Sequence, residues 1–330
     1  MDIQSASIRR GKRQVPSKKN GITNGKSRHQ FLEGDALAML DTIADESCRL
    51  VITSPPYNIG KEYERDRRRS LPEYMEWLDP IIEKACQKVT ADGHLCWQVG
   101  NHISNGELFP LDYFFYKIIT NKGFHLRNRV IWHFNFGLHA TKRFSGRYET
   151  LLWFTKSQQY HFNLEAVRVP QLYPGKRHSQ ARGDKAGRPS GNPKGKNPSD
   201  FWIFEPKAEF FGTPVWDIPN VKANHPEKTI HPCQFPSELV ERCILALTEV
   251  GDTVLDPFVG TGTSVIAAAK HGRCGIGIDQ SSRYIELARH RLAEHHAGRL
   301  ITRPIGEPVR KPKTGERVAT IPTEWKTAAE

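Results

Sequence analysis

Apolar residues recur along this chain in two alternating spacings, which predict a succession of strands and helices. Apolar residues three and four positions apart predict helices over residues 36–47, 71–89, 111–123, 237–250 and 281–296, with a further Ala-rich helix after Gly262. Shorter apolar runs predict strands over residues 29–33, 50–53, 93–100, 125–134, 148–157, 253–256 and 275–278. Because strands and helices alternate, we expect an α/β fold with a doubly wound, mostly parallel sheet.

Residues 170–200 interrupt this pattern. They are rich in Pro, Gly, Lys and Arg and almost free of aliphatic side chains, so they cannot supply a core and should form a long loop. The polar ends of the chain, 1–28 and 303–330, are expected to be a flexible basic arm and a flexible tail. The remaining chain then divides into a compact part over 29–156, an inserted region over 157–230 and a second compact part over 231–302.

The charge of the chain points to an anionic partner. A formal net charge of +12 and a pI near 9.4 favour binding to a phosphate polymer such as nucleic acid. No apolar run approaches the roughly 20 residues of a membrane span, and the basic N-terminus lacks the apolar segment of a secretory signal. We therefore expect a cytoplasmic protein that is not bound to a membrane. The six scattered cysteines show no CxxC spacing, and no His cluster suggests a metal site.

A Gly-rich turn between two predicted strands carries the first chemical signal. Asp256 ends the first strand, Gly260-Thr261-Gly262 opens the helix, and Asp279 ends the next strand. Glycines allow a ligand to approach the backbone closely. An acid at the end of the second strand, here Asp279, suits the hydroxyls of a ribose. A carboxylate at Asp256 would repel a pyrophosphate but attract a cationic amino group or a sulfonium. We therefore expect S-adenosyl-L-methionine, which carries both cations and no phosphate, rather than NAD.

The second signal is Ser54-Pro55-Pro56-Tyr57, directly after an apolar strand. Two prolines fix φ and leave carbonyls displayed in a stiff arc, although such a turn could simply cap a strand. Beside the Gly-rich turn it suits methylation of a base amino group, whose delocalised lone pair is a poor nucleophile. Ser54 Oγ and the Pro55 carbonyl could accept both amino hydrogens and aim the lone pair at the sulfonium methyl. The base would have to leave the duplex, and Tyr57 could then stack on it.

With both motifs in hand, the chain resembles the DNA amino-methyltransferases of restriction-modification systems. The residues that carry the resemblance are Ser54 to Tyr57 (SPPY) and Asp256 to Thr263 (DPFVGTGT), in the order typical of the beta group. The resemblance spans roughly residues 30 to 295. It implies a Rossmann-like class I methyltransferase fold, S-adenosyl-L-methionine as cofactor and double-stranded DNA as substrate. It also allows a cognate restriction endonuclease in the same system, and a monomer or a homodimer.

The resemblance also assigns expected roles to particular positions. Residues 29–156 would form the catalytic part, 157–230 the target-recognition region and 231–302 the cofactor-binding part. The expected catalytic residues are Ser54, Pro55, Pro56 and Tyr57. The expected cofactor-binding residues are Asp35, His231, Pro232, Gln234, Asp256, Pro257, Phe258, Gly260, Gly262, Thr263 and Asp279. The expected DNA contacts are Lys142, Arg143 and Arg147. The basic composition of the long loop adds Lys176, Arg177, Lys194 and Lys196 as expected contacts to the DNA backbone, and a solvated linker is an equal alternative for that loop.

The target base stays open between two amino bases. Serine at position 54 is more typical of enzymes that methylate N4 of cytosine, since adenine enzymes of this type usually carry aspartate there. Asn58 and the stretch RFSGRYETLLWFTK resemble segments of N6-adenine enzymes. We expect transfer to N4 of cytosine, with N6 of adenine as the alternative. Cys233 as a C5-cytosine nucleophile is disfavoured by the presence of SPPY, and a non-catalytic DNA-binding module would fail to bind S-adenosyl-L-methionine.

Overall fold

The computed structural model describes residues 29–58, 69–134, 139–171, 173–178, 185–202, 221 and 225–307. The predicted arm (1–28) and residues 308–330 of the predicted tail lie outside this range. The helices are α1 (Ala36–Leu40), α2 (Leu71–Lys88), α3 (Leu111–Asn121), α5 (Ser237–Leu247), α6 (Thr263–Lys270), α7 (Ser282–His296) and the 3₁₀ turn η2 (Leu164–Val167). The strands are β1 (His29–Glu33), β2 (Cys48–Thr53), β3 (Val89–Val99), β4 (Asn101–Ser104), β5 (Glu107–Pro110), β6 (His125–His133), β7 (Tyr148–Thr155), β8 (Phe201–Trp202), β9 (Thr253–Asp256) and β10 (Cys274–Asp279).

One eight-stranded sheet runs through the molecule in the order β1-β10-β9-β2-β3-β7-β6-β8. Strands β1, β10, β9, β2 and β3 are parallel, whereas β7 pairs antiparallel with both β3 and β6. The predicted doubly wound, mostly parallel sheet is therefore confirmed. Strands β2 and β9 are adjacent in the sheet, and the strands that follow them in the chain, β3 and β10, lie on opposite sides of this pair. Ligands bind open α/β sheets at such a switch point, beyond the carboxyl ends of the strands.

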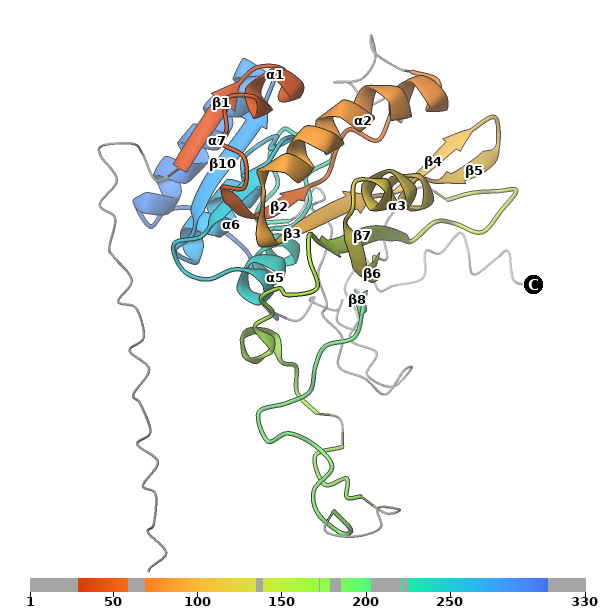
Figure 1. Ribbon diagram of the computed structural model, residues 1–330, viewed down its shortest axis with the longest axis vertical. Helices are drawn as coiled ribbons and strands as arrows, with labels where there is room; N and C mark the ends of the chain where they lie inside the picture. The colour runs from red at the N-terminus through yellow and green to blue at the C-terminus, as the bar shows by residue number, and fades with distance from the viewer. Residues whose placement is uncertain are drawn as a thin grey trace, which may run out of the picture.

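Hydrophobic clusters cover both faces of the sheet, and successive side chains along a strand point alternately into one cluster and the other. On β2, Val51 packs into a cluster with helices α1, α2 and α3, whereas Leu50 and Ile52 pack with α5 and α6. Figure 1 shows α2 and α3 together over one part of the sheet. Because both faces are covered, the central strands read as continuous apolar runs rather than alternating ones. None of the helices in the described part of the chain is long and apolar enough to cross a bilayer.

Helix α2 begins where the sequence predicts and is anchored to the turn after β2. Ser70 and Glu73 form a capping box, in which the Ser70 N–H donates to Glu73 Oε2 at 2.8 Å. One turn into the helix, the Tyr74 hydroxyl donates to the Pro56 carbonyl at 2.5 Å. The N-terminal half of α2 therefore fixes the Pro-Pro turn.

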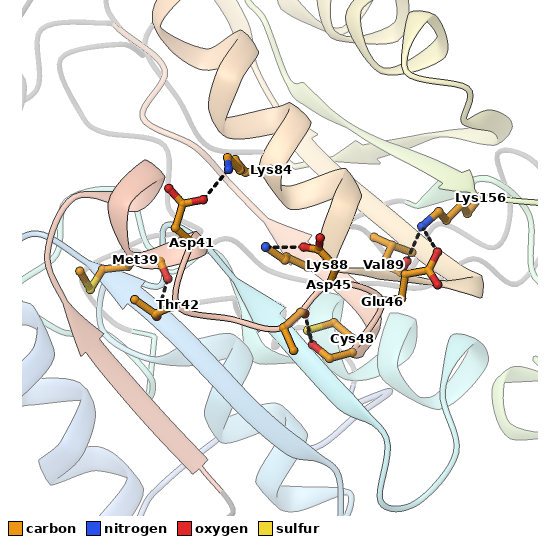
Figure 2. Close-up of polar contacts among 12 residues, drawn as sticks. Met39, Asp41, Thr42, Asp45, Glu46, Cys48, Lys84, Lys88, Val89 and Lys156 are labelled. Carbon is orange, nitrogen blue, oxygen red and sulfur yellow. Dashed lines mark hydrogen bonds and ion pairs between the residues drawn. The ribbon is translucent and has the colours of Figure 1, made fainter.

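Ion pairs connect the segments at the amino-terminal ends of the central parallel strands (Figure 2). In the segment before β2, Asp41 pairs with Lys84, and Asp45 pairs with Lys88 at 2.6 Å. Lys156, just after β7, donates both to Glu46 and to the Val89 carbonyl. These contacts lie at the edge of the sheet opposite to the turns that follow β2 and β9.

Four features depart from the sequence predictions. The helix predicted over residues 36–47 ends at Leu40, and turns follow it up to β2. The hairpin of β4 and β5 and the two-residue edge strand β8 were not predicted, since each is too short to show a period. Strand β8 means that the inserted region contributes to the sheet. The flexible tail predicted from residue 303 is wrong at its start. Arg303 is buried and pairs with Glu238 of α5 at 2.6 Å, while its N–H donates to Glu227.

Candidate functional site

A cavity opens at the carboxyl ends of β2 and β9, where the two sequence motifs meet. All four residues of the Ser-Pro-Pro-Tyr turn line it. The predicted cofactor-binding residues that line it are Asp35, His231, Gln234, Pro257, Phe258, Gly260, Thr263 and Asp279. Its remaining lining residues are Gly34, Ala36, Trp77, Cys233, Phe235, Val259, Thr261, Gln280, Ser281 and Tyr284. The sheet topology thus brings residues 34–57 and 231–284 to one hollow.

The Ser-Pro-Pro-Tyr turn is held rigidly from two sides. The Pro56 carbonyl accepts the Tyr74 hydroxyl, whereas none of the described residues donates to the Pro55 carbonyl. After the turn, Asn58 adopts a left-handed φ of 56°. Its side chain accepts from the Arg69 N–H at 2.9 Å and donates to the Arg69 carbonyl at 2.6 Å. Asn58 therefore pins the start of α2 to the end of the turn.

A chain of hydrogen bonds leads from the turn into strands β7 and β3. Ser54 Oγ donates to the Tyr57 hydroxyl at 2.9 Å, and that hydroxyl donates to Glu149 Oε2 at 3.2 Å. The same carboxylate oxygen accepts from the Gln98 amide. Glu149 and Gln98 were not predicted as site residues. Gln98 could have been noticed, because it is the lone polar residue of the apolar run Leu95–Val99, whereas Glu149 is followed by Thr150 and gave no such signal.

The Gly-rich loop contains two glycines, Gly260 and Gly262, and each is a glycine for a different structural reason. Gly260 lines the cavity with φ 50°, and its N–H donates to Asp279 Oδ2 at 3.0 Å. Gly262, also predicted to contact the cofactor, is not among the residues that line the cavity. A Cβ on Gly262 would lie 2.8 Å from the Ala288 Cβ, and its φ is 86°. Its role is close packing of α6 against α7.

Asp256 also departs from its predicted role. Its side chain is fully buried beneath the loop and does not line the cavity. It accepts from the Thr53 hydroxyl (2.6 Å), the Ser264 hydroxyl (2.6 Å) and the Phe258 N–H (3.0 Å). Burial raises the pKa of Asp256 to about 6, against the opposing effect of these hydrogen bonds. Asp256 thus ties β2 to the Gly-rich loop instead of meeting a cation.

This buried carboxyl predicts a pH-dependent difference in stability. Because its pKa is raised, the folded state binds the proton more tightly, and this contribution to stability is lost as pH rises through about 6. Asp256→Asn removes the effect while keeping an acceptor. Relative to wild type, the free energy of unfolding of the variant should rise by about 2 kcal/mol between pH 4.5 and 7.5. Urea unfolding of both proteins at several pH values measures the difference, and a flat difference contradicts the assignment.

The segment from His231 to Gln234 forms another wall of the cavity. The His231 ring lies 4.7 Å from the Tyr284 ring, and its Nδ1 accepts from the Cys233 N–H. Burial lowers the pKa of His231 to about 4, so the ring is neutral at pH 7. The Gln234 amide donates to the Glu227 carbonyl at 3.0 Å and braces this segment. Pro232, predicted as a cofactor residue, does not line the cavity.

The electrostatics of the cavity suit a ligand that carries positive charge and no phosphate. The carboxylates of Asp35 and Asp279 line it, and the residues named above as its lining include no Lys or Arg. Aromatic faces come from Trp77, Phe258 and Tyr284, with the first two rings 6.0 Å apart. An adenosine with a sulfonium and an amino group fits this set, whereas a pyrophosphate would meet two carboxylates and no Lys or Arg. Across the described residues, no cluster of three His, Cys, Asp or Glu could hold a metal ion.

The predicted DNA contacts lie outside the cavity. Lys142 and Arg143 are exposed on the loop between β6 and β7, and that loop also carries Phe144, which is 99% exposed. Arg147 is partly buried on the same loop, two residues before Glu149. Lys176, Arg177, Lys194 and Lys196 lie on the separate long loop, seen in green in Figure 1. There Lys194 pairs with Glu165 at 3.1 Å.

Comparisons with known proteins agree with this geometry. Residues 48–290 match the family model of the N6 and N4 DNA methylases. The type II methyltransferase M.BglII of Bacillus subtilis is 43% identical over 261 residues, covering 79% of this chain and 68% of that protein. The DNA adenine methyltransferase YhdJ of Escherichia coli K12 is 31% identical over 299 residues, covering 88% of this chain and 90% of that protein.

A solved structure extends the match to the cofactor. TTHA0409 of Thermus thermophilus, in complex with S-adenosyl-L-methionine, superposes with a TM-score of 0.56 at 26% identity. The match covers 81% of this chain and 93% of that one. The expected class I methyltransferase fold and S-adenosyl-L-methionine as methyl donor are therefore confirmed. The chain belongs to the N6/N4 DNA methylase family of S-adenosyl-L-methionine-dependent methyltransferases.

Proposed function

We propose that this enzyme methylates the exocyclic N4 of cytosine in double-stranded DNA. The observation that carries the proposal is that the Ser-Pro-Pro-Tyr turn and the Gly-rich loop line one cavity. S-Adenosyl-L-methionine supplies the electrophilic methyl group. Within this proposal, Asp35, Asp279 and His231 would hold the cofactor, and the Ser-Pro-Pro-Tyr turn would hold the base.

The turn can activate an amino group by geometry alone. Ser54 Oγ and the Pro55 carbonyl would each accept one amino hydrogen of the base, which biases the nitrogen towards tetrahedral geometry. Tyr74 and Asn58 fix the turn, so these acceptors need no rearrangement when charge develops on the nitrogen. The base reaches them by leaving the duplex, and the Tyr57 ring offers it a stacking face. No covalent bond to the enzyme is required.

The choice of cytosine over adenine rests on Ser54. A serine hydroxyl at the first position of the turn is typical of N4-cytosine enzymes, whereas adenine enzymes usually carry aspartate. The second candidate is N6 of adenine, which the similarity to the adenine methyltransferase YhdJ favours. The test is mass spectrometry of nucleosides from DNA methylated by the purified enzyme. We expect N4-methylcytosine, and N6-methyladenine as the only product would overturn the cytosine assignment.

The basic long loop is proposed to contact the DNA backbone. Each phosphate contact contributes about 0.9 to the slope of log affinity against log salt. Replacing Lys176, Arg177, Lys194 and Lys196 with Gln should flatten this slope, as measured by fluorescence anisotropy between 50 and 200 mM salt. The control for net charge removes four charges away from the loop, by Lys84→Gln, Lys117→Gln, Arg289→Gln and Arg299→Gln. An unchanged slope in the loop variant contradicts the contact.

The biological setting is also part of the proposal. Similarity to the type II methyltransferase M.BglII supports a restriction-modification system with a cognate endonuclease. Mapping modified bases after expression in a methylation-free host would give the recognised sequence. Analytical ultracentrifugation would distinguish a monomer from a homodimer.

A further inference from the structure

We propose that Glu149 is a positioning residue that turns Ser54 into a hydrogen-bond acceptor towards the target base. The site would thereby select bases that carry an amino group over bases that carry a carbonyl group at the same position. This inference deepens the proposed function and rests on it. The residues involved come from the turn after β2 and from strands β7 and β3.

The Glu149 carboxylate determines which group donates and which accepts at each step of this chain of hydrogen bonds. An ionised carboxylate can only accept hydrogen bonds. Glu149 Oε2 accepts from both the Gln98 amide and the Tyr57 hydroxyl, so the Tyr57 proton points at Glu149. The Tyr57 oxygen is then left to accept, and Ser54 Oγ donates its own proton to it at 2.9 Å.

The consequence appears at the cavity. With its proton committed to Tyr57, Ser54 Oγ presents only lone pairs to a ligand. Lone pairs attract an amino N–H of cytosine or adenine and repel the carbonyl oxygen that uracil or hypoxanthine carries at the same place. Without an anion at the far end, both hydroxyls could rotate, and Ser54 could donate to a carbonyl instead.

Packing holds this chain of hydrogen bonds, from Ser54 through Tyr57 to Glu149, in place. Tyr57 is only 9% exposed, and burial together with the neighbouring Glu149 carboxylate raises the pKa of its hydroxyl well above the ordinary value. Tyr57 therefore keeps its proton. At the end of β3, a Cβ on Gly100 would lie 3.3 Å from the Tyr57 ring and 3.6 Å from Glu149 Cγ. The small residue lets both side chains approach each other.

The first test is a double-mutant cycle on the enzyme with its mapped DNA site. Glu149→Gln should lower the single-turnover methylation rate roughly 10- to 100-fold, the range for a hydrogen bond to a charged group, with unchanged affinity for S-adenosyl-L-methionine. In a Tyr57→Phe background, Glu149→Gln should have no further effect, because the link to Ser54 is already broken. Additive losses would overturn the proposal. Glu107→Gln, on the exposed β5 strand, is the charge-matched control and should retain the wild-type rate.

The second test directly measures the preference of the site for a base with an amino group over a base with a carbonyl group. Binding is measured to DNA that carries the target base or its carbonyl analogue, uracil for cytosine or hypoxanthine for adenine. Wild type should prefer the amino base, and both Glu149→Gln and Tyr57→Phe should shrink this preference roughly tenfold. An undiminished preference in both variants contradicts the proposal. The analogue follows the base identified by mass spectrometry, so a wrong target base is recognised separately.

Discussion

Ser54→Ala is expected to reduce methyl transfer by about 100- to 1,000-fold while leaving the affinity for S-adenosyl-L-methionine unchanged. That range is typical for loss of one preorganised group that stabilises developing charge. The hydroxyl lies at the cavity but the backbone of the turn is fixed by Tyr74 and Asn58, so the substitution should not disturb the turn. Single-turnover transfer of a labelled methyl group measures the rate, and isothermal titration measures cofactor binding.

Two companion variants make this result specific. Ser54→Thr keeps a hydroxyl and should retain more activity than the alanine variant. Cys233→Ser should keep most activity, because the proposed reaction needs no thiolate although Cys233 lines the cavity. A wild-type rate for Ser54→Ala would make the catalytic assignment wrong, and complete loss in a folded Cys233→Ser would point to C5 chemistry.

Asp279→Ala is expected to weaken binding of S-adenosyl-L-methionine by about 10- to 100-fold, corresponding to one hydrogen bond to a charged group. The side chain lines the cavity at the end of β10 and also accepts from the Gly260 and Ser281 N–H groups. Its removal should therefore lose the proposed cofactor contact and loosen the Gly-rich loop. At saturating cofactor, turnover should recover more than in Ser54→Ala.

The control for Asp279 is a carboxylate at the other end of the neighbouring strand. Asp252 lies just before β9 at the amino edge, where it pairs with Arg49 at 3.3 Å. Asp252→Ala should leave the cofactor dissociation constant unchanged in the same titration. Equal weakening in both variants would indicate general destabilisation rather than a cofactor contact.

The sequence predicted the elements whose period was long enough to read. Helix α2 was predicted within one residue of its observed end, because Pro72 near its start and a long apolar stripe mark it. The two-residue strand β8 has no period, and its position depends on pairing with β6, a long-range contact. The docking of Arg303 depends likewise on Glu238, which is 65 residues away.

Within the site, the motifs could be predicted but the direction of particular side chains could not. Asp256 was expected to face a cation because it ends a strand beside the Gly-rich turn. In the structure its carboxylate points inward, onto Thr53 and Ser264, and Asp35 and Asp279 supply the negative charge of the cavity instead. Glu149 was missed because only the pairing of β3 with β7 brings it to Tyr57.

The central claim is that the Pro-Pro turn aims a base amino nitrogen at the methyl donor. It is tested most directly by a structure of the enzyme with its DNA site and a non-transferable analogue of S-adenosyl-L-methionine. We predict an extruded base whose amino nitrogen lies about 3 Å from both Ser54 Oγ and the Pro55 carbonyl oxygen. An extruded base held elsewhere, with the turn facing solvent or protein alone, would contradict the account.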